Sequence, residues 1–147
     1  MEELYTIYVY KDKKDTLLVI PYAKNDQGVR TNVNKPQIIE PPLIMEQLGL
    51  KTREAFEVAI QETYLKRDHV YVIAHLTGIK SWKKLHKEYL FVRAILTPDS
   101  QYIFYPGIGV TSDWDEEKGI SLPTNATNEE MGTAVMNTFE LHRLSRL

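Results

Sequence analysis

The last quarter of the chain reads Ile120-Ser-Leu-Pro-Thr-Asn-Ala-Thr-Asn-Glu-Glu-Met-Gly-Thr-Ala-Val135 and continues to Leu147. It predicts an extended segment, a polar turn and one long amphipathic helix. Thr127 and Glu130 have the spacing of a capping box, in which the hydroxyl and the carboxylate accept from N–H groups at the helix start. Glu129 and Glu130 also place negative charge at the positive end of the helix dipole. The residues with helical spacing that should face a core are Met131, Ala134, Val135, Thr138, Phe139 and His142.

The size and composition indicate a soluble globular protein. A chain of 147 residues, 43% hydrophobic and 26% charged, fits a single domain spanning residues 1–147. No segment approaches the roughly 18 apolar residues of a membrane span, and the start Met-Glu-Glu-Leu-Tyr lacks the features of a secretory signal. Because the chain has no cysteine, disulfides, thiolate zinc sites and thiol catalysis are excluded. We therefore expect a cytoplasmic protein without a membrane partner.

The first third of the chain predicts strands followed by a helix. Strand-forming residues fill 4–10 and 16–20, which predicts a hairpin, and Pro21 should end the second strand or mark an edge. A further short strand is expected at 29–33, and an extended segment at 37–42. A helix should run from about Met45 to Tyr64. Its expected inward stripe is Leu48, Thr52, Ala55, Phe56, Ala59, Ile60 and Thr63.

The middle of the chain contains the clearest hairpin. Residues 88–96 and 101–105 are the two strands, and Thr97-Pro-Asp-Ser100 is the turn between them. Residues 70–74 predict another strand, and residues 81–86 a short helix. Together these elements predict an α+β fold, in which a largely antiparallel sheet packs against two long helices.

The two long helices share a sequence pattern. Glu46-Gln-Leu-Gly49 and Phe56-Glu57 recur as Glu129-Glu-Met-Gly132 and Phe139-Glu140. A glycine inside a helix costs about 1 kcal/mol against alanine. We expect a close approach of each helix backbone to the sheet to justify that cost.

An acidic cluster precedes the last helix at Asp113, Trp114, Asp115, Glu116 and Glu117. Residues 113–147 hold 7 acids and 3 bases, a net charge of −4, and residues 1–112 hold 13 acids and 15 bases, a net charge of +2. The cluster does not match the ligand spacing of a calcium loop. It is either a solvated loop or a docking loop for a basic protein, in which Trp114 would be the interface anchor. A hydrolase that draws its acids from this loop is a further alternative.

A basic cluster lies at Lys80, Trp82, Lys83, Lys84 and Lys87. Cations around an aromatic residue suit nucleic-acid phosphates and bases. The simpler interpretation is a solvated helix face that Trp82 anchors inward. Because the whole chain is slightly acidic, a nucleic-acid partner is the second hypothesis.

The sequence indicates no metal or cofactor. His69, His75, His86 and His142 lack the spacing of a metal site. No G-x-S-x-G turn marks a serine nucleophile, and the segment 106–110 lacks the lysine of a phosphate loop.

Several short motifs resemble the contact-dependent growth inhibition immunity protein (CdiI) family. They are Ile120-Ser-Leu-Pro123, Ala126, Glu130-Met-Gly132 with Ala134-Val135, the segment Gly78-Ile-Lys-Ser-Trp-Lys-Lys84, Leu48-Gly49 and the closing Ser145-Arg146. Met131 stands where the family has leucine, and Thr138-Phe139 where it tends to Ala-Leu; both changes suit a core.

The resemblance implies a small cytoplasmic protein without catalytic activity or cofactor. Its partner would be the toxic C-terminal domain of a cognate contact-delivered toxin, often a nuclease, which it would bind and neutralise. The family's shared motifs are structural, so the resemblance assigns no binding residue. From the charge pattern, we expect the partner-binding residues to be Asp113, Trp114, Asp115, Glu116 and Glu117.

Overall fold

One antiparallel sheet contains every strand of the computed structural model, which describes residues 4–67 and 70–147. The strands are β1 (Tyr5–Lys11), β2 (Leu17–Lys24), β3 (Arg30–Asn32), β4 (Gln37–Ile39), β5 (Leu90–Leu96), β6 (Gln101–Pro106) and β7 (Ile120–Pro123). Their order is β3-β2-β1-β5-β6-β7, and β4 pairs with β2 beyond the end of β3. The predicted α+β fold and both predicted hairpins are confirmed.

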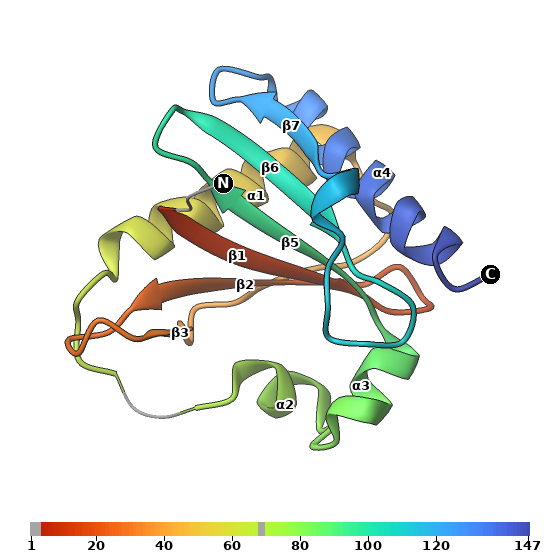
Figure 1. Cartoon of the computed structure of the whole chain (residues 1–147), viewed down its shortest axis with the longest axis horizontal. Coiled ribbons are helices and arrows are strands. Elements are labelled where there is room, and N and C mark those ends of the chain that lie inside the picture. The colour runs from red at the N-terminus through yellow and green to blue at the C-terminus, as the bar shows by residue number, and fades with distance from the viewer. Residues whose placement is uncertain (1–3, 68–69) are drawn as a thin grey trace.

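Helices cover the sheet on both faces (Figure 1). They are α1 (Met45–Gln61), α2 (Val72–Thr77), α3 (Trp82–Glu88) and α4 (Asn128–Leu144), with a 3-10 turn, η1 (Glu116–Lys118), before β7. The long helices α1 and α4 lie side by side on one face, and α2 and α3 pack below the other face in the view of Figure 1.

The alternation of side chains along the strands divides the core in two. In β1, Ile7 and Val9 face α1 and α4, while Tyr8 and Tyr10 face the opposite side. The first side is the main core, where Phe56 of α1 and Phe139 of α4 are fully buried. The second side is partly covered, by α2, α3 and the segment between β6 and β7.

Of the two alternatives predicted for Pro21, a strand end is wrong, because β2 continues to Lys24, and the other alternative was a sheet edge. Pro21 pairs with Ile7 of β1, and its carbonyl accepts from the Val33 N–H at 2.8 Å on the other side. That other side is the gap between β3 and β4, which pair with different parts of β2. The missing proline N–H therefore falls where no ladder hydrogen bond is required.

The strand predicted at 70–74 is wrong, since α2 begins at Val72. The side chain of Asn32 explains the change: its Oδ1 accepts from the Val72 N–H at 3.0 Å, and its Nδ2 donates to the Val70 carbonyl at 2.5 Å. Gly78, at φ +71°, ends the helix after two turns. The short helix predicted at 81–86 is confirmed as α3, with Ser81 as its N-cap.

The helix predicted after Met45 is confirmed, although it ends at Gln61, and most of its predicted inward stripe is buried. There are two exceptions: Ile60 is 44% exposed, and Thr63 lies beyond the end of the helix and is half-buried. Arg53 of α1 donates to the Asn128 side chain at 2.7 Å and to the carbonyls of Thr124 and Ala126. Arg53 therefore joins α1 to the turn before α4, where Thr127 and Glu130 form the predicted capping box.

The repeated glycines face the opposite helix and not the sheet, which corrects the expectation from the sequence. A Cβ on Gly49 would lie 1.7 Å from the Asn128 carbonyl oxygen, at the start of α4. A Cβ on Gly132 would lie 2.0 Å from the Met45 carbonyl oxygen, at the start of α1. Each helix therefore places its glycine against the first residue of the other.

We predict that Gly49→Ala and Gly132→Ala each lower the free energy of unfolding by about 3 kcal/mol or more, because the new methyl group meets backbone that cannot rotate away. Denaturant unfolding of each variant measures this loss. At an ordinary helix position a glycine-to-alanine change would raise the free energy of unfolding by about 1 kcal/mol. The sign of the measured change therefore decides whether the close contact exists. Asn137→Ala, at an exposed position of α4, is the control and should be near neutral.

Candidate protein-binding surface

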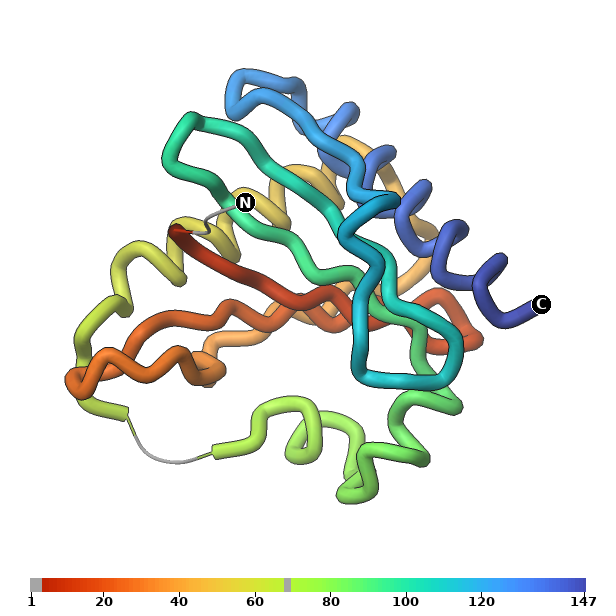
Figure 2. The backbone as a smooth tube through the Cα atoms, in the orientation of Figure 1, coloured from red at the N-terminus to blue at the C-terminus, as the bar shows by residue number. Residues whose placement is uncertain are grey.

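The acidic cluster lies in the segment 107–119, which joins β6 to β7. This segment leaves β6 beside the end of α4 and returns along the second face of the sheet (Figure 2). Its first half folds back on itself, since Ile108 N–H donates to the Asp113 carbonyl at 3.0 Å and Asp115 N–H donates to the Pro106 carbonyl at 2.8 Å. Backbone hydrogen bonds therefore give the segment a defined shape.

The acids of the cluster differ in how they face solvent. Asp113, Glu116 and Glu117 are exposed, whereas Asp115 is half-buried. The Asp115 carboxylate accepts from the Glu117 N–H at 3.0 Å and so caps η1. Three carboxylates are thus presented outward and the fourth also stabilises the turn that presents them.

Trp114 packs on the sheet and is only partly available to a partner. The Arg93 guanidinium lies 4.3 Å from the centre of its ring, a cation–π contact. The indole N–H donates to Glu116 at 3.3 Å. The ring also covers a small buried group on the second face of the sheet, formed by Ile95, Ile103 and Tyr105. Trp114 therefore fixes the acidic segment against β5 and β6.

The end of α4 holds the base of the same segment at Gly109. Gly109 N–H donates to the Ser145 hydroxyl at 2.8 Å. Its carbonyl accepts from His142 Nε2 at 2.9 Å and from Arg146 Nε at 2.6 Å. We call His142, Ser145 and Arg146 the C-terminal clamp.

Arg146 extends the clamp to a third element. Its Nη2 donates to the carbonyl of His86 at 2.6 Å and to that of Tyr89 at 2.9 Å, at the junction of α3 and β5. One guanidinium therefore joins the acidic segment, α3 and the end of α4. In the sequence, Ser145-Arg146 stands out only through the family resemblance, which assigns these residues no role.

His142 is a fully buried structural histidine. Its Nδ1 accepts from the Phe91 N–H at 3.0 Å, which requires an unprotonated Nδ1, and its Nε2 then carries the proton donated to Gly109. Burial lowers the pKa of His142 to about 4; the Arg146 charge acts in the same direction, and the Gly109 carbonyl partly opposes them. The ring is therefore neutral at pH 7.

His86 is also buried, and neither ring nitrogen has a hydrogen-bond partner among the described residues. Burial and the nearby Arg146 charge lower its pKa as well. Its ring stacks under Trp82, with 6.0 Å between the ring centres and 17° between the planes. Trp82 is 53% exposed, so it does not anchor α3 inward as the simpler interpretation required.

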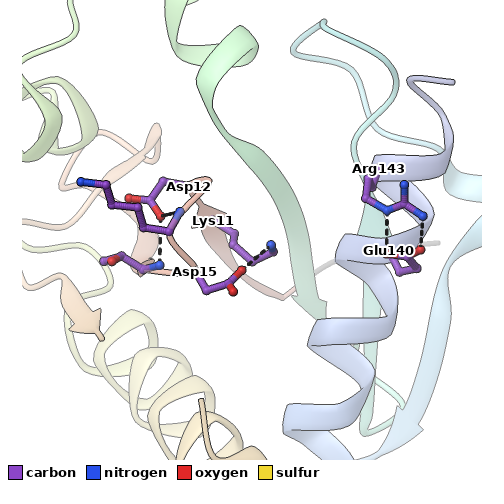
Figure 3. Close-up of polar contacts among 7 residues, drawn as sticks. Lys11, Asp12, Asp15, Glu140 and Arg143 are labelled. Atoms are coloured by element: carbon purple, nitrogen blue, oxygen red, sulfur yellow. Dashed lines mark hydrogen bonds and ion pairs between the residues drawn. The ribbon is translucent and has the colours of Figure 1, made fainter. Parts of the chain in front are cut away.

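Figure 3 shows surface polar contacts of a turn and of a helix. Lys11 pairs with Asp15 at 2.9 Å across the β1–β2 turn, and Asp12 accepts from two N–H groups of that turn. On α4, Arg143 donates to Glu140 at 2.9 Å and lowers the pKa of that carboxyl group. Such exposed pairs contribute little to stability and define no site.

No group of three His, Cys, Asp or Glu side chains is placed to hold a metal ion within residues 4–67 and 70–147. His69, one of the four histidines considered above, lies outside the described residues. Across the same described ranges, no helix combines the length and apolar character that a bilayer span needs.

The structure of this chain resembles solved structures, although comparisons of its sequence found no match. No family model and no curated protein matches it. A protein of unknown function from Neisseria meningitidis superimposes with a TM-score of 0.68 at 14% identity, over 96% of this chain and 97% of that one. A chain of the CdiA-CT/CdiI toxin and immunity complex from Yersinia pseudotuberculosis superimposes with a TM-score of 0.66 at 12% identity, over 95% and 98%. At these identities the likeness shows a shared fold.

Because His142 of the C-terminal clamp is buried and neutral, we predict that the free energy of unfolding falls in acid. In the unfolded chain His142 takes up a proton below about pH 6.5, whereas in the folded protein it does so only near pH 4. The contribution of His142 to the free energy of unfolding is therefore complete above pH 6.5 and falls as the pH drops toward 4. The full loss is about 3 kcal/mol. Urea unfolding of the wild type and of His142→Gln, at about pH 7 and about pH 4.5, measures it.

The variant isolates this histidine from His86, whose lowered pKa acts in the same direction. The stability difference between wild type and His142→Gln should shrink as the pH falls. An equal difference at both pH values would contradict a neutral, buried His142.

Proposed function

We propose that this chain is an immunity protein that binds and neutralises the toxic C-terminal domain of a contact-dependent growth inhibition toxin. It would act as a stoichiometric inhibitor and not as an enzyme. The partner we propose is a nuclease domain, whose substrate cleft must be basic to hold nucleic-acid phosphates. The acidic segment would occupy that cleft in place of the substrate.

The observation that carries the proposal is the full-length likeness to a chain of a toxin and immunity complex, at 95% of this chain and 98% of that one. The likeness extends over nearly all of both chains, so it concerns the whole fold of that chain and not one part of it. The motifs described above resemble the immunity protein family independently of that superposition.

The geometry of the acidic segment supports the proposed contact. Asp113, Glu116 and Glu117 are exposed on a segment fixed at its base by the C-terminal clamp and along its length by Trp114. A fixed segment loses little conformational entropy on binding. Opposite charges would then speed the encounter with a basic cleft, and the rigid presentation would slow dissociation.

Neutralising the acids tests the proposed surface. The variant Asp113→Asn, Asp115→Asn, Glu116→Gln, Glu117→Gln should weaken binding to the cognate toxin domain by about tenfold or more and flatten its salt dependence. Asparagine at 115 retains an oxygen that can cap η1. Calorimetry at two salt concentrations measures both effects.

A second variant with the same change in net charge is the control. Glu40, Glu46, Glu54 and Glu57, which belong to the β4–α1 side of the chain, are replaced by Gln. If both variants bind equally well, the acidic segment is not the contact. Neutralisation of the toxin is tested by co-expression of this chain and the toxin domain in bacteria. If the chain is toxic alone, or does not protect cells from the toxin domain, it is not the immunity protein of that toxin.

A further inference from the structure

A hollow of about 500 Å³ lies on the second face of the sheet, away from the acidic segment. It is lined by the turn between β2 and β3, by the residues before α2, and by Trp82 of α3. An adjoining hollow of about 430 Å³ shares Tyr71, Ile73 and Trp82 with it. Such volumes are typical of sites that hold small organic groups.

Two exposed aromatic rings line both hollows. Trp82 is 53% exposed, and His86 stacks against one side of its indole. Tyr71 is 57% exposed, and the side chain of Asn32 fixes its position by bonding the backbone on both sides of it, at Val70 and Val72. Exposed aromatic rings fixed by their backbone and stacking partners are platforms for a further planar group.

The charge of this region is positive. Arg30, Lys66 and Arg67 line the larger hollow, with Asp26 as the acid among its described lining residues. The described partners of Arg67 are uncharged, namely the Ala23 and Glu62 carbonyls and the Thr31 hydroxyl, so its charge is not neutralised by a carboxylate there. The nearby sequence 70–87 adds four lysines and no acid.

We propose that this hollow is a binding site for single-stranded nucleic acid. Bases stack on Trp82 and Tyr71, and phosphates lie near Lys66, Lys80 and the two arginines. The side chain of Gln27, which lines the hollow, offers hydrogen bonds to base edges. An acidic peptide would use the cations but not the aromatic platforms, which is why the observations favour a nucleic acid.

This site extends the basic cluster recognised in the sequence. That cluster contained Trp82 and the lysines around it, all within residues 80–87. The structure adds Tyr71 and cations from β3 and from the chain before α2, and it places them around one hollow. The site does not depend on the proposed toxin binding, since it shares no residue with the acidic segment.

The chain provides its own reporter, because Trp82 and Trp114 are its 2 tryptophans. In a Trp114→Phe background, an unstructured oligouridylate of about eight nucleotides should quench the remaining Trp82 fluorescence at low salt. Anisotropy of the labelled oligomer then gives affinities. Trp82→Ala and Tyr71→Ala should each weaken binding roughly 5- to 150-fold. Lys66→Ala should reduce the slope of log K against log salt by about 0.7.

Tyr64→Ala is the matched control, since Tyr64 is 62% exposed and lies outside the two hollows. It should bind as the wild type does, and circular dichroism should show every variant folded. The proposal is overturned if the oligomer does not bind, if Tyr64→Ala weakens binding as much as Trp82→Ala, or if a duplex of the same length binds equally well. Displacement of the oligomer by polyglutamate at the same charge concentration would instead assign the hollow to an acidic protein.

Discussion

The close crossing of α1 and α4 at Gly49 and Gly132 is the contact on which the rest of the structure depends. Each glycine meets a carbonyl oxygen at the start of the other helix, at distances that leave no room for a Cβ. The two helices are therefore fixed in one mutual register, and both can place large side chains such as Phe56 and Phe139 on the same face of the sheet. Two isolated amphipathic helices would have many packing arrangements available, whereas a backbone contact permits very few.

Two arginines hold the two ends of α4 to the rest of the structure by hydrogen bonds. Arg53 of α1 donates to carbonyls of the turn before α4, and Arg146 after α4 donates to the carbonyls of His86 in α3, of Tyr89 before β5 and of Gly109 in the acidic segment. A guanidinium is suited to this work because it has five donors in a rigid plane. The exposed acids are thus connected, through the C-terminal clamp and α4, to the helix crossing.

Local patterns were sufficient to predict the strands, the long helices, the capping box and the fold class, because each depends on residues close in sequence. The errors arose from distant partners. Asn32 converts the expected strand at 70–74 into the start of α2, and the gap between β3 and β4 allows Pro21 to lie within β2. The repeated glycines were noticed, but only the crossing shows that each faces the other helix.

The candidate sites were less predictable for the same reason. The acidic cluster is contiguous and could be read directly, yet Trp114 looked exposed because its partner Arg93 lies on β5. Within the clamp, His142 and Ser145 are three residues apart, but their target Gly109 is 36 residues before Ser145. Tyr71 joins Trp82 at the hollow only through Asn32, a residue without any sequence signal of its own.

The separation of charge gives the molecule an electric dipole. Residues 113–117 contain four acids and no base, and residues 70–87 contain four lysines and no acid. In an external field such a molecule rotates before it makes contact, so a basic partner meets the acidic segment first and a polyanion meets α3 first. For the two proposed partners, the orientation of approach would thereby be set before contact.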